Sequence, residues 1–145
     1  MKLEEIEEEW EKDGKFDSTA LDLEAQRIPE LHHKYYKIYT REQLVQKKYY
    51  MDYSSMKKIK LEYYKGQLDF ATLKEHGWSQ FNLQLSTREI DVYLDSDIDL
   101  SKLNFKLEAQ NIKIKYIESI LSTIAFRNQS IKNAIDFLKF TNGVV

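Results

Sequence analysis

Residues 114–138, IKYIESILSTIAFRNQSIKNAIDFL, carry the strongest structural pattern in this chain. Two interleaved series of mostly isoleucine and leucine repeat every seven residues. They are Ile117, Ile124, Ile131 and Leu138, and Ile114, Leu121, Asn128 and Ile135. A sustained seven-residue repeat is typical of a helix that supercoils against another helix. The pattern therefore predicts that a long helix occupies residues 101–145 and dominates the fold.

The side chains at the repeated positions favour self-association. Isoleucine and leucine are mixed over both heptad positions, which favours an assembly larger than a dimer, with Asn128 setting the register. We predict that the contacts come from Ile117, Leu121, Ile124, Ile131, Ile135 and Leu138. The alternative is a core helix of a monomeric bundle. Phe126 and Phe137 widen the apolar surface, which fits either a bundle core or contacts with two neighbours.

The composition predicts one folded domain of all-α class, residues 1–145. Hydrophobic residues make up 42% of the chain and charged residues 32%, which excludes both a disordered chain and a membrane protein. One proline and four glycines provide few turns for a β-rich fold. No apolar run is long enough to span a membrane, and the acidic first ten residues do not resemble a signal peptide. The chain has no cysteine, so we expect a reducing cytoplasm.

Charge is segregated along the chain although the net charge is only −2. Residues 1–31 carry a net charge of −7, residues 32–66 of +6, residues 67–101 of −5 and residues 102–145 of +4. Eight of the ten tyrosines lie within residues 32–66. A positive block in a nearly neutral chain predicts a binding site for an anion.

Local signals divide the first two thirds of the chain into helices. An acidic amphipathic helix is predicted over residues 3–12 and should end at Gly14. Capping boxes are expected to begin helices at Thr19, Thr40 and Ser86. Pro29 must either kink the second helix or restart it. The helix that begins at Thr40 should continue to Gly66.

Residues 67–100 read as a variable connector between the N-terminal helices of residues 1–66 and the final helix. His76, Gly77 and Trp78 are expected to form a turn. The alternation of Phe81, Leu83 and Leu85 with polar residues fits either a short strand or an apolar loop anchor. The final helix should be capped by Asp97 or by Asp99.

The residues needed for catalysis or for a cofactor are missing. The four glycines are isolated, so no phosphate-binding loop occurs, and the three histidines do not form a site. Asp95, Asp97 and Asp99 resemble the start of a calcium loop, but Leu100 and Lys106 stand where glycine and glutamate are required. We predict no enzymatic activity, no metal and no cofactor.

The basic segment of residues 41–66 forms two faces on a helical wheel. Its apolar face consists of Val45, Tyr49, Tyr53, Met56, Ile59 and Tyr63, and the opposite line consists of Lys47, Ser54, Lys58 and Lys65. A solvated lysine face over a tyrosine core is the ordinary interpretation. Two observations favour a binding role instead: the lysines have few acidic neighbours at helical spacing, and Lys60 falls within the apolar face, where a buried ammonium is costly. The wheel does not assign a direction to Lys60.

Residues 9–35 and 58–66 also resemble parts of a known family. Glu9-Trp10-Glu11-Lys12-Asp13, Phe16-Asp17-x-Thr19-x-Leu21-x-x-Glu24 and Ile28-Pro29-x-Leu31-His32-x-Lys34-Tyr35 resemble the opening of the UvsY family of T-even-like phages. Lys58-x-Lys60-Leu61-Glu62-Tyr63-Tyr64-x-Gly66 resembles that family's basic DNA-binding element. The resemblance is good over residues 3–66, loose over residues 67–100, and mainly one of helical pattern beyond them.

This resemblance implies an all-helical, ring-forming homo-oligomer that binds single-stranded DNA and has no catalytic activity. Such a protein remodels DNA coated by single-strand-binding protein and helps a recombinase to load. The family's Lys-x-Arg/Lys pair corresponds to Lys58 and Lys60, and lysine at the second position lacks the planar fork of arginine. The predicted DNA-binding residues are Lys47, Lys48, Lys57, Lys58, Lys60, Lys65 and Tyr64. The alternative function is a helical scaffold or adaptor protein without DNA affinity.

Overall fold

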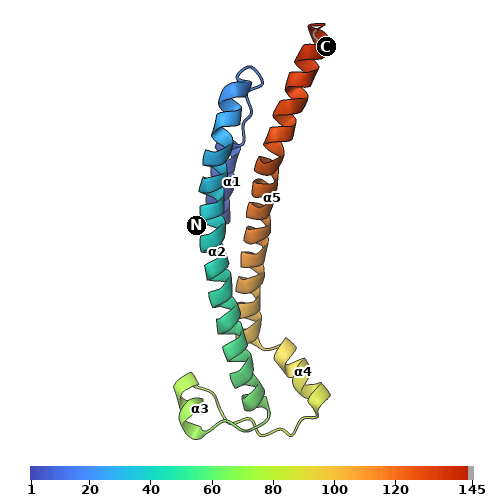
Figure 1. Ribbon diagram of the computed structural model, residues 1–145. Coiled ribbons are helices and arrows are strands. Elements are labelled where there is room, and N and C mark those ends of the chain that lie inside the picture. The colour runs from blue at the N-terminus through green and yellow to red at the C-terminus, as the bar shows by residue number, and fades with distance from the viewer. Residues whose placement is uncertain (144–145) are drawn as a thin grey trace. The chain divides into compact units, whose positions relative to one another are not determined.

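The computed structural model describes residues 1–143, and no strand occurs in that range. The helices are α1 (Leu3–Asp13), α2 (Leu21–Tyr64), α3 (Phe70–His76), α4 (Thr87–Asp95) and α5 (Ile98–Thr141), as Figure 1 shows. The predicted all-α class and the long final helix are therefore confirmed. Contacts divide the chain into two compact units. Unit 1 comprises Met1–Leu44 and Ile112–Val145, and unit 2 comprises Val45–Asn111.

Unit 1 is built on a core to which three helices contribute. The buried side chains are Ile6 of α1, Leu31 and Tyr35 of α2, and Ile117, Ile120 and Ile124 of α5. Trp10 packs edge-on against Tyr35, with the ring centroids 5.3 Å apart. Burying a large apolar side chain contributes roughly 1.5–3 kcal/mol, so the core accounts for the packing of α2 against α5 in this unit.

Polar contacts join α1 to α2 beside this core. The Lys34 ammonium lies 2.7 Å from a carboxylate oxygen of Glu9 and 2.6 Å from one of Asp13. The Tyr35 hydroxyl donates a hydrogen bond to Asp13 over 2.9 Å. Bonds from Lys34 and Tyr35 outweigh the effect of burial and hold the pKa of Asp13 below its ordinary value. Part of the acidic N-terminal charge is thus neutralised within unit 1.

Two of the predicted helix starts are wrong. The Thr19 hydroxyl donates to Asp17, and α2 begins at Leu21. Thr40 lies inside α2, where its hydroxyl donates to the carbonyl of Lys37 over 3.0 Å. A capping motif in a helix interior has no free backbone donors to satisfy, and threonine bonds back to the preceding turn instead.

The helix also continues through Pro29, so of the two alternatives, a kink or a restart, the restart does not occur. Proline lacks the backbone donor that would bond to the preceding turn. Leu31, two residues later, is buried in the core, and Ile28 packs against it. We attribute the continuity of α2 to this packing on both sides of Pro29, whose own side chain is exposed.

The heptad positions of α5 divide into two groups. Ile117, Ile124 and Ile131 are buried, and Leu121 packs against the core, whereas Ile135 and Leu138 are exposed. This corrects the prediction for Ile117 and Ile124. Their side chains are buried in the core of unit 1 and cannot also contact another copy of the chain. A heptad repeat indicates that a helix packs against a partner helix, but it does not distinguish a partner in the same chain from one in another copy. Self-association remains a prediction for Leu121, Ile131, Ile135 and Leu138, of which Ile135 and Leu138 are exposed.

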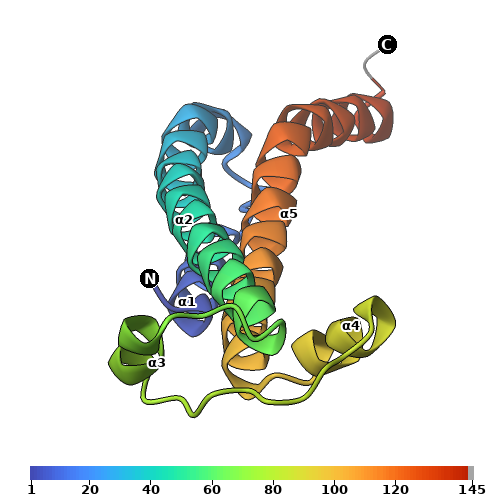
Figure 2. The same cartoon turned by 90° about the horizontal axis from the view of Figure 1, so that it is seen from below.

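Unit 2 surrounds the C-terminal end of α2. Figure 2 shows α3 and α4 on opposite sides of this end. The buried residues of this unit's core are Ile90 and Leu94 of α4 and Leu100 of α5, and Tyr53, Met56, Leu61, Tyr64 and Leu85 pack against them. Phe81 contacts the rings of Tyr63 and Tyr64. Of the two alternatives for Phe81, a short strand or an apolar loop anchor, the loop anchor is therefore correct.

The remaining helix-end predictions for unit 2 are confirmed. Gly66 follows the end of α2 with a φ of 71°, a conformation that favours glycine. Ser86 caps α4 by accepting a bond from the backbone of Glu89. Asp97, and not Asp99, caps α5 by accepting the backbone N–H of Leu100 over 2.9 Å.

Candidate nucleic-acid interface

The C-terminal part of α2 and the residue after it expose five lysines. Lys47, Lys48, Lys57 and Lys58 are exposed on the helix, and Lys65 is exposed directly after it; we call these five residues the lysine stripe. The residues predicted for the apolar face, Val45, Tyr49, Tyr53, Met56, Ile59 and Tyr63, are all half-buried. The two faces deduced from the helical wheel are thus confirmed, because the predicted opposite line of Lys47, Ser54, Lys58 and Lys65 is exposed.

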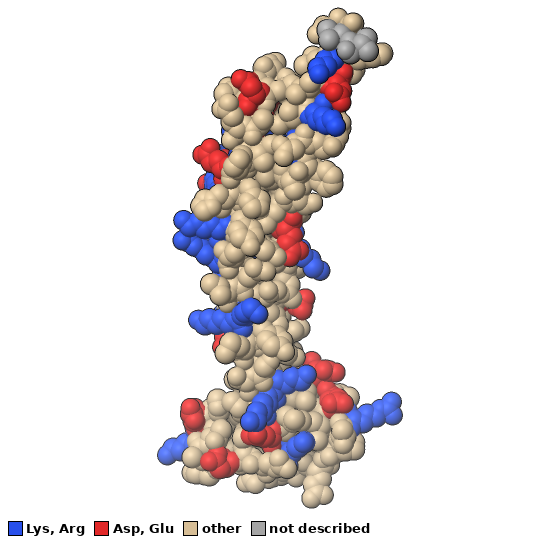
Figure 3. All heavy atoms as spheres, in the orientation of Figure 1, with Lys and Arg blue, Asp and Glu red and all other residues tan. Residues whose placement is uncertain are grey.

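The charges of the lysine stripe are not neutralised by the rest of the described chain. Within residues 1–143, none of the five ammonium groups forms an ion pair with a carboxylate. Lys57 instead lies over the ring of Tyr53, with 5.9 Å between its nitrogen and the centroid. Acidic and basic side chains are interspersed elsewhere on unit 2, as Figure 3 shows around α3 and α4. Unpaired lysines at helical spacing attract an extended polyanion.

Lys60 has a different environment from the lysine stripe. Its side chain is buried, with 5% of the residue exposed. Its ammonium lies 3.1 Å from Asp97 and 2.9 Å from Asp99, and 4.0 Å from the centroid of the Trp78 ring. Burial alone would lower the pKa of Lys60, but the bonds to Asp99 and Asp97 raise it above its ordinary value. Lys60 is therefore a charged, fully partnered side chain.

Tyr64 lies in the same cluster of contacts. Its hydroxyl donates to Asp97 over 2.5 Å, and its ring contacts Phe81 and Tyr93 at centroid distances of 5.1 and 5.4 Å. Burial and the bond to Asp97 raise the pKa of Tyr64. Burial would raise the pKa of Asp97, but the bonds from Tyr64, the backbone of Leu100 and Lys60 hold it below its ordinary value. The structure thus separates Lys60 and Tyr64 from the lysine stripe with which they were grouped.

The sequence pattern missed the residues that surround Lys60. A lysine within an apolar face requires a partner, which is a signal for some acid, but nothing in the pattern selects Asp97 and Asp99 over other carboxylates. The contact with Trp78 depends on the loop that follows α3, which carries no periodic pattern.

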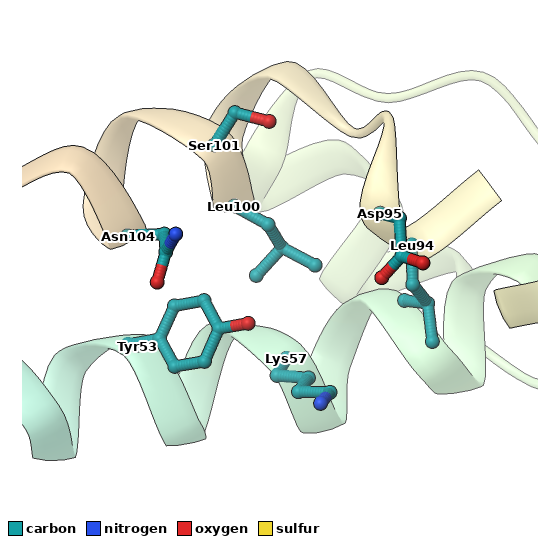
Figure 4. A pocket seen from close by; sticks show the side chains of 7 residues that line it. All are labelled: Tyr53, Lys57, Leu94, Asp95, Leu100, Ser101 and Asn104. Carbon is teal, nitrogen blue, oxygen red and sulfur yellow. The ribbon is translucent and has the colours of Figure 1, made fainter. Parts of the chain in front are cut away.

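A small pocket lies beside Lys57 in unit 2. Figure 4 shows Tyr53 and Lys57 of α2 facing Leu100 and Asn104 of α5, with Asp95 nearby. The lining residues are Tyr53, Lys57, Leu94, Asp95, Leu100, Ser101 and Asn104, and the volume is about 100 Å³. The Asp95 carboxylate repels phosphate, so this pocket is poorly suited to an anion.

Neither a metal centre nor a membrane span occurs in the part of the chain that the structure describes. No group of three or more His, Asp or Glu side chains in residues 1–143 has the arrangement needed to hold a metal ion. No helix in the same range is both long and apolar enough to cross a membrane.

Comparisons with known proteins agree with these features. The chain is similar to the crystal structure of the bacteriophage T4 recombination mediator protein UvsY in lattice type IV, with a TM-score of 0.82 and 26% identity over 97% of this chain and 99% of that one. Lattice type II of the same protein gives a TM-score of 0.84 and 25% identity, covering 98% of each chain. No match was found among curated proteins.

The match to a family model covers almost the whole chain. The model described as "Recombination, repair and ssDNA binding protein UvsY" matches residues 9–144. This range includes the lysine stripe, the contacts of Lys60 and the whole of α5. The chain therefore belongs to the UvsY family of recombination, repair and single-stranded DNA-binding proteins.

Proposed function

We propose that this chain is a recombination mediator that binds single-stranded DNA through the lysine stripe and helps a recombinase to load onto DNA coated by single-strand-binding protein. The observation that carries the DNA-binding part is the set of five exposed lysines without an ion-pair partner in residues 1–143. Membership of the UvsY family supports the same function and identifies a binding protein, not an enzyme.

Binding of DNA through the lysine stripe would not depend on the nucleotide sequence. Lysines contact phosphates and release counterions, and phosphates carry no sequence information. Sequence readout in nucleic acids relies mainly on arginine, asparagine and glutamine placed against base edges. The lysine stripe contains none of these, so electrostatic attraction to the phosphates would contribute most of the binding free energy.

Lys60 would support this surface without contacting DNA. Moving its ammonium to a phosphate would leave Asp97 buried without its cationic partner, which is costly. We propose that Lys60 fixes the end of α2 against the beginning of α5 in unit 2. Tyr64 would act with it through Asp97.

The protein partners are proposed from the family and from charge. The acidic residues of α1 include Glu4, Glu7, Glu8 and Glu11, which are exposed. This acidic surface fits a basic patch on a recombinase, on single-strand-binding protein or on another copy of the chain. Because the similar structures come from a bacteriophage, the cytoplasm of an infected cell is the proposed site of action.

Fluorescence anisotropy with labelled oligonucleotides tests the proposed function. The chain should bind single-stranded DNA with micromolar or tighter affinity, and affinity should fall steeply between about 50 and 200 mM salt. A duplex of the same length provides the comparison for strand preference. Absence of binding to a long single strand at low salt, or binding that does not change with salt, would contradict the proposal.

A further inference from the structure

A second cavity in unit 2 lies next to the lysine stripe. It has a volume of about 330 Å³ and is lined by Gln46, Lys47 and Tyr50 of α2 and by Leu107 and Asn111 of α5. This volume lies at the lower end of the range of about 300–1,000 Å³ usual for small-molecule sites. A lysine lines both this cavity and the pocket beside Lys57, but only this cavity has no carboxylate among its lining residues.

Tyr50 is the tyrosine of this helix segment whose ring is available for a ligand. It is 60% exposed, whereas Tyr53, Tyr63 and Tyr64 are half-buried in the core of unit 2 or its aromatic contacts. The ring of Tyr49 is covered by Lys106, whose ammonium lies 4.5 Å from the centroid. An exposed aromatic ring beside lysines provides a surface on which a nucleobase can stack.

An amide pair provides hydrogen-bonding groups in the same cavity. The side-chain amide of Gln46 donates to the carbonyl oxygen of Asn111 over 2.6 Å. This bond leaves the carbonyl oxygen of Gln46 and the amide nitrogen of Asn111 for other partners. One acceptor and one donor side by side match the polar edge of a base, and the pair can invert to suit another base. Leu107, with 9% of its surface exposed, contributes an apolar wall.

We propose that this cavity is a nucleobase subsite of the single-stranded DNA interface. A base stacks on the ring of Tyr50, its polar edge meets the amides of Gln46 and Asn111, and the adjacent phosphate pairs with Lys47. The inference rests on the proposed function and adds to it a contact with bases, which the lysine stripe alone does not provide. Double-stranded DNA cannot occupy the subsite, because its bases are stacked and paired.

An abasic oligonucleotide separates this subsite from the phosphate contacts. It carries the same phosphates as an oligothymidine of equal length but no bases, so the ratio of the two affinities isolates the contribution of the bases. Stacking on one ring should favour the thymidine strand by about 5- to 150-fold. Tyr50→Ala should bring this ratio close to 1 without changing the dependence on salt, and Tyr50→Phe should retain the ratio.

Tyr36→Ala is the matched control, because Tyr36 is 49% exposed and lies on α2 outside the lysine stripe. It should leave the ratio unchanged. A wild-type ratio of 1, or a Tyr50→Ala variant that retains the wild-type ratio, would overturn the subsite alone. Failure of the wild type to bind either strand would overturn the proposed function and the subsite with it. Circular dichroism of each variant verifies that the helices are retained.

Discussion

The ammonium of Lys60 and the carboxylate of Asp97 form a buried ion pair, with 3.1 Å between Nζ and Oδ2. The pair joins Lys60, near the C-terminal end of α2, to the residue that caps α5, both within unit 2. Asp97 also accepts bonds from the Tyr64 hydroxyl and the backbone of Leu100. One carboxylate thus connects the end of α2 with the beginning of α5 and fixes the direction of Lys60.

Removal of the Lys60 charge should destabilise the protein strongly. Lys60→Met leaves Asp97 buried without its cationic partner, and such a loss costs about 3–5 kcal/mol. Lys58→Met, two residues away and exposed, should change the free energy of unfolding by no more than about 0.5 kcal/mol. Urea denaturation at one protein concentration, followed by circular dichroism, measures both. Equal denaturation midpoints for the two variants would contradict the structural role of Lys60.

The Asp97 carboxylate should make the free energy of unfolding depend on pH under acidic conditions. Its pKa is lower in the folded chain than the ordinary value of 3.8, so its contribution is present above that value and is lost as pH falls towards the folded pKa. The free energy of unfolding should therefore fall as the pH drops from about 5 to below 3.8, and it should fall less in Asp97→Asn. Asp91→Asn, an exposed change on α4, should retain the full wild-type decrease. An identical pH dependence in Asp97→Asn would contradict this assignment.

Periodicity and local signals in the sequence predict the helices and their exposed faces. The partners of individual side chains depend on tertiary contacts, which these signals do not contain. Seven-residue spacing predicted α5, and the wheel predicted which side of residues 41–66 is exposed. The same spacing could not distinguish a partner helix in the same chain from one in another copy, so Ile117 and Ile124 were assigned to the wrong contact. Lys60 lacked a direction because its partners are 37 and 39 residues away in sequence.

The Tyr64 hydroxyl should contribute to stability. Tyr64→Phe removes its bond to Asp97 while keeping the ring, and an unsatisfied buried group costs about 1–3 kcal/mol. Tyr50→Phe is the matched control, because Tyr50 is exposed and its hydroxyl has no partner in residues 1–143. Thermal unfolding of both variants at one concentration provides the measurement. A lower melting temperature for Tyr50→Phe than for Tyr64→Phe would contradict the arrangement of the aromatic cluster.

The lysine stripe should determine how DNA affinity depends on salt. Each lysine that contacts one phosphate contributes about 0.7 to the slope of log affinity against log salt on a single strand. Lys57→Gln and Lys58→Gln together should lower the slope by about 1.4 on that basis. Lys132→Gln, an exposed change on α5, should leave it unaltered.

Lys60→Met provides a further comparison for the same slope. At a temperature where this variant is folded, the slope should equal that of the wild type, because the Lys60 ammonium pairs with Asp97 and Asp99. A slope reduced as much as in Lys58→Gln would instead place Lys60 at the DNA. Anisotropy titrations at several salt concentrations distinguish the two results.

Self-association should depend on the exposed end of α5 and not on its buried middle. Ile135 and Leu138 are 38% and 47% exposed, so changing both to aspartate leaves the core of unit 1 intact. Burial of these side chains between copies would be prevented by the added charge, and light scattering at micromolar concentration should show a lower mass. Lys132→Asp changes the net charge equally on the same helix and should retain the wild-type mass. A monomeric wild type would contradict self-association, and an unchanged mass in the double variant would place the contact elsewhere.

Ile117→Ala should instead lower the free energy of unfolding by about 2–5 kcal/mol, because it opens a cavity in the core of unit 1.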